Sequence, residues 1–364
     1  MAQTNYIPKI AYHPGETLRE KLDEMQMSVK EFAVRTNKPE KTIYAVINGD
    51  SSLTTDMAVA FENVTGIPAH FWINKQRNFD EYVARQKQAV QLSQACVWAT
   101  LFPYAKMVKY GWIHAYKNIE DRAMELLRFF RISSIDAWEK YYLSTTSSTH
   151  FRVSLYATKE PYAISAWLCR GEQQMQDTSS LLEYSPTQLK KRIDDMKQLM
   201  VKQPNDFATQ LQEMCAGVGI KLVYTPCLPK APISGSTRWK GNTPCIQLSG
   251  RYKQYDIFWF TFFHEIGHIL LHGKKNIFLE NVSYEDSDAS KEEEADKFAA
   301  DIMLSQDAET EIVQNKQFSK HIIEQYAVKF NTHPSVIVGR LHHKGILPYS
   351  KGTDFRISVN LFPN

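Results

Sequence analysis

Residues 258–273 read FWFTFFHEIGHILLHG, and the pattern His-Glu-Ile-Gly-His lies in the middle of this strongly apolar stretch. On an α-helix, His264 and His268 are separated by about 40° around the axis, so both imidazoles lie on one face and can bind the same metal ion. Glu265 lies about 100° from His264, to one side of the pair. Catalytic zinc sites take three protein ligands and a water molecule, so this stretch needs a further ligand from elsewhere in the chain.

The acidic segment that follows, KEEEADKFAADIML at residues 291–304, is the expected source of that ligand. Its apolar residues recur at helical spacing, and this stripe would turn Glu293 toward solvent. Glu292 and Glu294 flank the stripe on either side, so the spacing does not choose between them. His272, four residues after His268, is a further candidate at the end of its helix.

This cluster predicts hydrolytic chemistry. Zinc would lower the pKa of its bound water from about 15.7 towards about 7, and Glu265 would then accept the proton. The alternative interpretation is two partly buried core histidines and one surface glutamate. Against it, Glu265 is an ionisable side chain within an apolar segment, and burying an unpaired carboxylate is costly. The residues therefore favour a metal site.

Composition limits the class of protein. The chain has 364 residues, enough for two or three domains, and its net charge of +3 is too near neutral to imply nucleic acid or a membrane surface. The five cysteines include no Cys-x-x-Cys pair, which excludes a cysteine zinc finger and favours reduced thiols in the cytoplasm. No signal-like segment opens the chain and no run of about 18 apolar residues occurs, so no membrane span is expected.

We predict an α+β fold that is mostly α, in three parts. Residues 1–85 are expected to form a five-helix domain, residues 86–204 a helical linking or interaction domain, and residues 205–364 a domain that carries the metal site and a small β-sheet. Alternating and apolar runs between turn residues predict the strands of that sheet. They lie at residues 219–224, 234–239 and 245–248.

The N-terminal part has the spacing of a helix-turn-helix. Ser28 and Glu31 form a capping box before a short helix, and a turn near residue 38 leads into a second helix at residues 41–48. In such modules the second helix enters the major groove of DNA. The residues expected to contact DNA are Lys38, Lys41, Thr42, Tyr44 and Asn48.

The alternative for this part is a helical bundle that binds no DNA. Residues 1–80 contain nine Lys or Arg against ten Asp or Glu, so no overall basic field attracts phosphate. Binding would then need a local basic patch and a homodimer.

Two resemblances add to this interpretation. FWFTFFHEIGHILLHGKK and EEEADKFAADIML resemble the ImmA/IrrE family of zinc metallopeptidases, over about residues 205–350. This resemblance implies a zincin-like domain in which His264, His268 and Glu294 hold Zn2+ and Glu265 is the catalytic base. Ser305 departs from the family, where a proline often follows the second helix; the difference bears on how the helix ends.

The second resemblance covers residues 12–85. HPGETLREKL, SVKEFAVRTN and TIYAVINGDSSLTTDMAVAFENVTGIPAHFW resemble helix-turn-helix domains of the XRE type, close to HigA-type antitoxins. This resemblance implies sequence-specific binding to operator DNA.

Together these observations predict a DNA-binding transcriptional regulator with a zinc-dependent endopeptidase domain that cleaves a repressor or an antitoxin-like protein. The alternative is an antitoxin or transcriptional repressor of a toxin–antitoxin module, with a structural or inactive metal site. We expect substrate backbone to add to a strand edge at residues 245–249. Arg238 and Arg251 would hold a substrate carbonyl or carboxylate, or they are ordinary surface residues.

Overall fold

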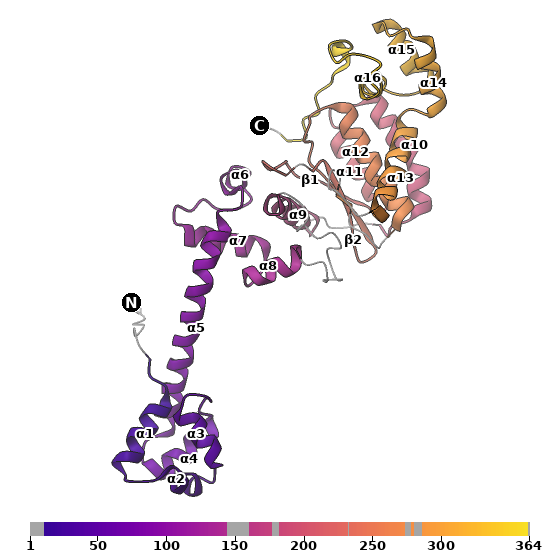
Figure 1. Cartoon of the computed structure of the whole chain (residues 1–364). Helices are drawn as coiled ribbons and strands as arrows, with labels where there is room; N and C mark the ends of the chain where they lie inside the picture. Colours follow the sequence, from indigo (N-terminus) through magenta and orange to yellow (C-terminus); the bar gives the residue numbers. More distant parts are fainter. Residues whose placement is uncertain are drawn as a thin grey trace. The chain divides into compact units, whose positions relative to one another are not determined.

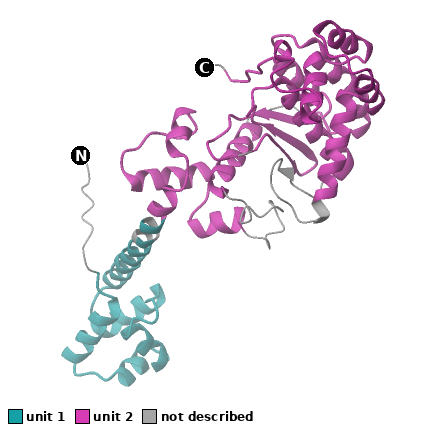
Figure 2. Cartoon of the chain, turned by 45° about the horizontal axis from the view of Figure 1, so that its top comes forward, with its two compact units in different colours: residues 1–94 teal, residues 95–364 magenta. Residues whose placement is uncertain are grey.

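The computed structural model divides into two compact units, residues 1–94 and residues 95–364 (Figure 2). Helices predominate in the described part of the chain and the sheet is small, which confirms a mostly helical α+β class (Figure 1). None of the described helices is long and apolar enough to cross a membrane. The structure describes residues 11–143, 160–176, 182–231, 233–273, 278–279 and 286–362.

The first unit is built from short helices and most of a longer one, which surround an aromatic core. Ser28 Oγ accepts a hydrogen bond from the Glu31 N–H at 3.2 Å, as the capping box predicts. Phe61 lies edge-on to both Phe32 and Trp72, at 4.9 and 5.8 Å between ring centroids. The helices are α1 (Pro14–Glu24), α2 (Val29–Arg35), α3 (Glu40–Ile47), α4 (Thr55–Thr65) and α5 (Ala69–Ala99).

The second unit combines helices with a four-stranded sheet. Its first helices are α6 (Tyr104–Lys109), α7 (Ile119–Phe130), α8 (Ile135–Tyr142), α9 (Pro161–Gln176), α10 (Pro186–Lys202) and α11 (Phe207–Ala216). The strands are β1 (Lys221–Tyr224), β2 (Gly235–Lys240), β3 (Thr243–Leu248) and β4 (Phe278–Leu279). The later helices are α12 (Tyr255–Gly267), α13 (Asp286–Met303), α14 (Gln306–Asn315), α15 (Lys320–Lys329) and α16 (Pro334–His343).

The strand order in the sheet is β1-β3-β2-β4. Ile246 of β3 pairs with Leu222 of parallel β1 and with Thr237 of antiparallel β2, so β3 has a hydrogen-bonded strand on each side. The prediction that residues 245–249 form an exposed edge is therefore wrong. Apolar alternation located these strands, but it carries no information about their order in the sheet.

Helices cover both faces of this sheet. On β2, Thr237 Oγ1 donates to the carbonyl of Glu265 in α12 at 3.3 Å, and the next side chain, Arg238, donates to the carbonyl of Leu168 in α9 at 3.2 Å. Because successive strand residues point to opposite faces, α12 and α9 lie on opposite sides of the sheet. Gln247 Nε2 also donates to Trp167 O, at 2.7 Å. The predicted domain boundaries at residues 85 and 204 stay predictions.

Helix α12 is buried over most of its surface. Trp259 stacks on Phe263 at 5.9 Å between centroids, and Phe262 lies edge-on to Phe263 at 5.2 Å. A helix that is apolar all round is stable only inside a core. This packing fixes α12 rigidly, and with it the histidines near its end.

A half-buried histidine caps the start of helix α16. His333 Nδ1 accepts a hydrogen bond from the Ser335 N–H at 3.1 Å, and the ring lies 4.3 Å from the ring of Tyr255. Burial lowers the pKa of His333 to about 4. The folded chain therefore keeps this ring neutral at a pH where an unfolded chain would protonate it.

We predict that His333 makes the second unit sensitive to mild acid. Its stabilising effect is complete above the unfolded pKa of about 6.5 and is lost as pH falls towards the folded value. Between pH 7.5 and 5 the loss would be roughly 2 kcal/mol for a fully buried ring, and about 1 kcal/mol here because the ring is partly exposed. Urea unfolding of wild type and His333→Asn at both pH values measures it. Asn retains a capping group, so the variant should lose about 1 kcal/mol less on acidification; equal losses would contradict the prediction.

Candidate metal centre

Two imidazoles and one carboxylate converge between α12 and α13. His264 Nε2 lies 2.9 Å from His268 Nε2. The carboxylate of Glu292 lies 3.2 Å from His264 Nε2 and 3.5 Å from His268 Nε2. One ligand atom from each residue lies within 4.8 Å of the others. Two nitrogens and one oxygen at this spacing fit a zinc ion with three protein ligands.

A glycine lets the two helices approach closely enough for this convergence. A Cβ atom at Gly267 would lie 3.2 Å from Ala295 Cα and 3.1 Å from the Phe298 ring. Any side chain at this position would push α13 outward. The glycine in the His-Glu-Ile-Gly-His pattern therefore helps to bring Glu292 to the imidazoles.

The second ring nitrogen of each histidine is also engaged. His264 Nδ1 lies 2.8 Å from Asp296 Oδ1. His268 Nδ1 lies 2.9 Å from His272 Nδ1, in a π-helical turn that spans His268–His272. Hydrogen bonds at Nδ1 fix the ring orientation and leave Nε2 to the metal. The sequence did not point to Asp296, although it follows Glu292 by four residues and so shares its helix face.

Glu294 occupies a different place from the one expected. Its carboxylate lies 3.1 Å from His272 Nε2, and it is Glu292 that faces both His264 and His268. The structure thus replaces Glu294 with Glu292 as the candidate third ligand. Glu294 is left two hydrogen bonds away from the centre, through His272.

The electrostatics of the cluster favour a cation. Burial by itself lowers the pKa of His264, but the carboxylates of Asp296 and Glu292 outweigh it and raise the value to about 10. Burial likewise would raise the pKa of Glu292, but its hydrogen bonds to the two imidazoles lower it to about 2. The same carboxylates that stabilise a positive charge on the His264 ring would also stabilise a bound divalent cation.

The carboxylate of Glu265 is fully buried beside strand β2. A Cβ atom at Gly235 would lie 2.5 Å from Glu265 Oε1 and 2.7 Å from Thr261 Cγ2. Only a glycine at this point of β2 leaves space for the carboxylate. Nothing in the sequence singled out Gly235, because the contact joins segments 30 residues apart.

The two arginines proposed for substrate lie in different surroundings. Arg238 is buried under α9, where it donates to Leu168 O and lies 3.4 Å from Glu172. The Arg238 side chain points to the face of the sheet opposite α12. It therefore makes structural contacts there, instead of the substrate contact that the sequence suggested. Arg251 is exposed, and its guanidinium lies 4.7 Å from the centre of the Tyr252 ring.

In the first unit, the residues expected to contact DNA lie on or beside α3. Lys41, Tyr44 and Asn48 are exposed and Thr42 is half-buried. Lys38 forms an ion pair with Asp56 of α4, which neutralises part of its charge. Asn48 Oδ1 accepts a hydrogen bond from Arg19 at 3.4 Å, so a further cation lies at this end of α3.

Comparison with known proteins assigns both regions. Residues 215–342 match the family model of the IrrE N-terminal-like domain, which contains the whole histidine–carboxylate cluster. The N-terminal region is 31% identical over 88 residues to an uncharacterised HTH-type transcriptional regulator, YddM, of Escherichia coli K12, covering 24% of this chain and 92% of that protein. The chain belongs to the HTH-type regulators. It combines their domain with an IrrE-like one, which confirms both resemblances.

Solved structures match the same region. A HigA-family addiction module antidote protein from Coxiella burnetii is 31% identical, covering 23% of this chain and 91% of its own, with a TM-score of 0.22. The Pseudomonas aeruginosa antitoxin HigA with the higBA promoter is 28% identical, covering 22% and 91%, with a TM-score of 0.21.

We predict that Glu292→Gln weakens zinc binding by more than about 100-fold, because it removes a carboxylate that faces both imidazoles. Glu294→Gln should weaken it by about tenfold or less, since Glu294 acts only through His272. Titration against a chromophoric chelator measures both affinities, and the two variants control for each other on the same helix. A larger loss in Glu294→Gln would restore Glu294 as the ligand.

Proposed function

We propose that this regulator carries a zinc-dependent endopeptidase in its IrrE-like domain and cleaves a regulatory protein, a repressor or an antitoxin-like partner. The observation that carries the proposal is the convergence of His264, His268 and Glu292 next to the buried carboxylate of Glu265. We assign the helix-turn-helix domain to residues 1–85, a helical linking part to 86–204 and the peptidase to 205–364. Five free cysteines suit a cytoplasmic location.

In this proposal each residue has a defined task. His264, His268 and Glu292 hold the ion, which when bound supplies a Lewis acid that polarises the peptide carbonyl and acidifies water. Asp296 holds the His264 ring in the orientation that presents Nε2. Glu265 accepts a proton from the attacking water at its carboxylate and returns it to the leaving amine. Gly235 keeps the space in which that carboxylate lies.

We further propose that the first unit binds operator DNA through α3. Exposed Lys41 and Tyr44 would enter the major groove, with Thr42 beside them and Asn48 near the backbone. Lys38 would need to exchange its ion pair with Asp56 for a phosphate. The similarity of the N-terminal region to an HTH-type transcriptional regulator supports this part.

A second candidate function is an antitoxin or repressor whose metal site is structural or inactive. The burial of the site favours it, since His264 and His268 are 2% and 1% exposed. Structural zinc sites are closed, whereas catalytic sites keep a position open to water. Glu292 is the more accessible ligand, with 22% of its side chain exposed, which favours the enzyme.

We predict that Glu265→Gln retains zinc and the thermal stability of wild type but slows cleavage of the partner by about 100- to 10,000-fold, because Gln cannot accept a proton. The variant would capture the partner from cells, because it binds the partner without cleaving it. The captured partner would then be incubated separately with wild-type and Glu265→Gln protein, and the rates of cleavage compared. His264→Ala is the control that should lose the metal as well. If regulation in cells is unchanged by Glu265→Gln, the second candidate replaces the first.

We predict that Lys41→Ala weakens DNA binding by about tenfold and reduces the dependence of log affinity on log salt concentration by about one. Duplexes selected from a random pool by the wild-type chain would serve as ligands in anisotropy titrations. Lys21→Ala, which removes a cation paired with Glu24 on α1, is the matched control and should bind as wild type does. Equal losses in both variants would indicate non-specific charge rather than contact through α3.

A further inference from the structure

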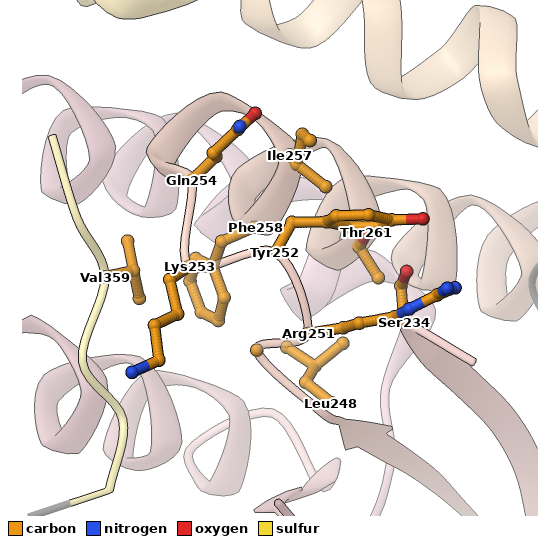
Figure 3. A pocket seen from close by; sticks show the side chains of 11 residues that line it. Ser234, Leu248, Arg251, Tyr252, Lys253, Gln254, Ile257, Phe258, Thr261 and Val359 are labelled. Carbon is orange, nitrogen blue, oxygen red and sulfur yellow. The ribbon is translucent and has the colours of Figure 1, made fainter. Parts of the chain in front are cut away.

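A small hollow lies between the start of β2 and the first half of α12 (Figure 3). Its apolar floor is formed by Leu248, Ile257, Phe258 and Val359. Its polar lining comes mostly from the loop between β3 and α12, and we call it the Arg251 hollow. The polar residues that line it are Ser234, Arg251, Tyr252, Lys253, Gln254 and Thr261.

The Arg251 hollow adjoins the carboxylate of Glu265. Ser234 lines it and is followed by Gly235, where a Cβ atom would touch both Glu265 and Thr261. Thr261 also lines it and precedes Glu265 by four residues, which is slightly more than one turn, or about 6 Å, along α12. A peptide bond placed at the metal centre would therefore have a neighbouring side chain within reach of the hollow.

The loop that lines the hollow is held at both ends. Ser249 N donates to Ser234 O, and Ser249 Oγ donates to Ile233 O, both at 2.8 Å. Val359 N donates to Lys253 O at 2.9 Å. These bonds fix the backbone that carries Arg251 and Lys253, so little backbone conformational entropy is lost when a ligand binds them.

The charge of the hollow is wholly positive. Arg251 and Lys253 are exposed, no acidic residue lines the hollow, and neither cation forms an ion pair within the described part of the chain. The Tyr252 ring holds the Arg251 guanidinium at 4.7 Å, and Arg251 extends toward Ser234 (Figure 3). Asp256, near the start of α12, is the acidic residue closest in sequence to these two cations. It lines two other hollows, together with Gly339.

We propose that the Arg251 hollow binds an acidic side chain of the protein substrate, next to the peptide bond that is cleaved. This inference rests on the proposed peptidase function. The enclosed space is only about 10 Å³, roughly that of one water, so the carboxylate would lie at the mouth of the hollow, where Arg251 and Lys253 are exposed. Arg251 would pair with both carboxylate oxygens, and Lys253 would add a second cation. The substrate class is then a regulatory protein with Asp or Glu beside its cleavage site.

The test measures binding apart from cleavage. Zinc-loaded Glu265→Gln protein is titrated with labelled peptides that span the cleavage site of the captured partner, with Glu, Gln or Lys placed at each flanking position in turn. At one position Glu should bind at least about tenfold more tightly than Gln. Adding Arg251→Glu should reverse this preference to Lys, and Arg251→Lys should retain part of it. Lys351→Glu, an exposed charge reversal outside the hollow, should leave the preference unchanged.

The outcomes separate the two proposals. Equal binding of Glu and Gln peptides at every position, or a preference that survives Arg251→Glu, overturns the assignment of the hollow even if wild-type protein cleaves its partner. Failure of wild-type protein to cleave any of these peptides overturns the peptidase instead. If no partner is captured, a pool of random peptides takes its place in the same titrations.

Discussion

The close packing of α13 on α12 is the constraint on which the candidate site depends. At Gly267 the two helices approach until a single methyl group would touch the backbone of Ala295. This contact sets both the distance and the rotation of α13, and so decides which of its carboxylates faces the imidazoles. The apolar packing of Trp259, Phe262 and Phe263 supplies the rigid support beneath. The chemistry of the site is thus a consequence of helix packing.

The sequence located one helix of the site well and the other incompletely. Helical spacing placed His264 and His268 on one face, and local geometry is sufficient for that. The choice between Glu292 and Glu294 depends on how α13 is rotated against α12, and two residues of the same type on either flank of an apolar stripe carry no information about that rotation. Asp296 was overlooked for the same reason, since its partner lies on another helix.

The sheet shows a similar limit. Alternation predicted the strands but not that β3 would be central, because strand order is a tertiary property. Arg238 is buried under α9, which takes this guanidinium as a structural cation, and no local pattern in the sequence shows that a helix covers this face of the sheet. The residues near Glu265 that the structure adds, Gly235 and Thr261, come from a contact between a strand and a helix that no local pattern reports.

The candidate metal ligands come from separate helical segments of the chain. Because His264 lies in α12, His268 in the π-helical turn that continues it and Glu292 in α13, a bound cation would also cross-link helical segments that are separated by a long connection. Its binding free energy then adds to that of folding, by about 2.7 kcal/mol when free metal exceeds its dissociation constant a hundredfold. The lifetime of this regulator in a cell would accordingly follow the local supply of the ion, and metal starvation would mark the chain for degradation.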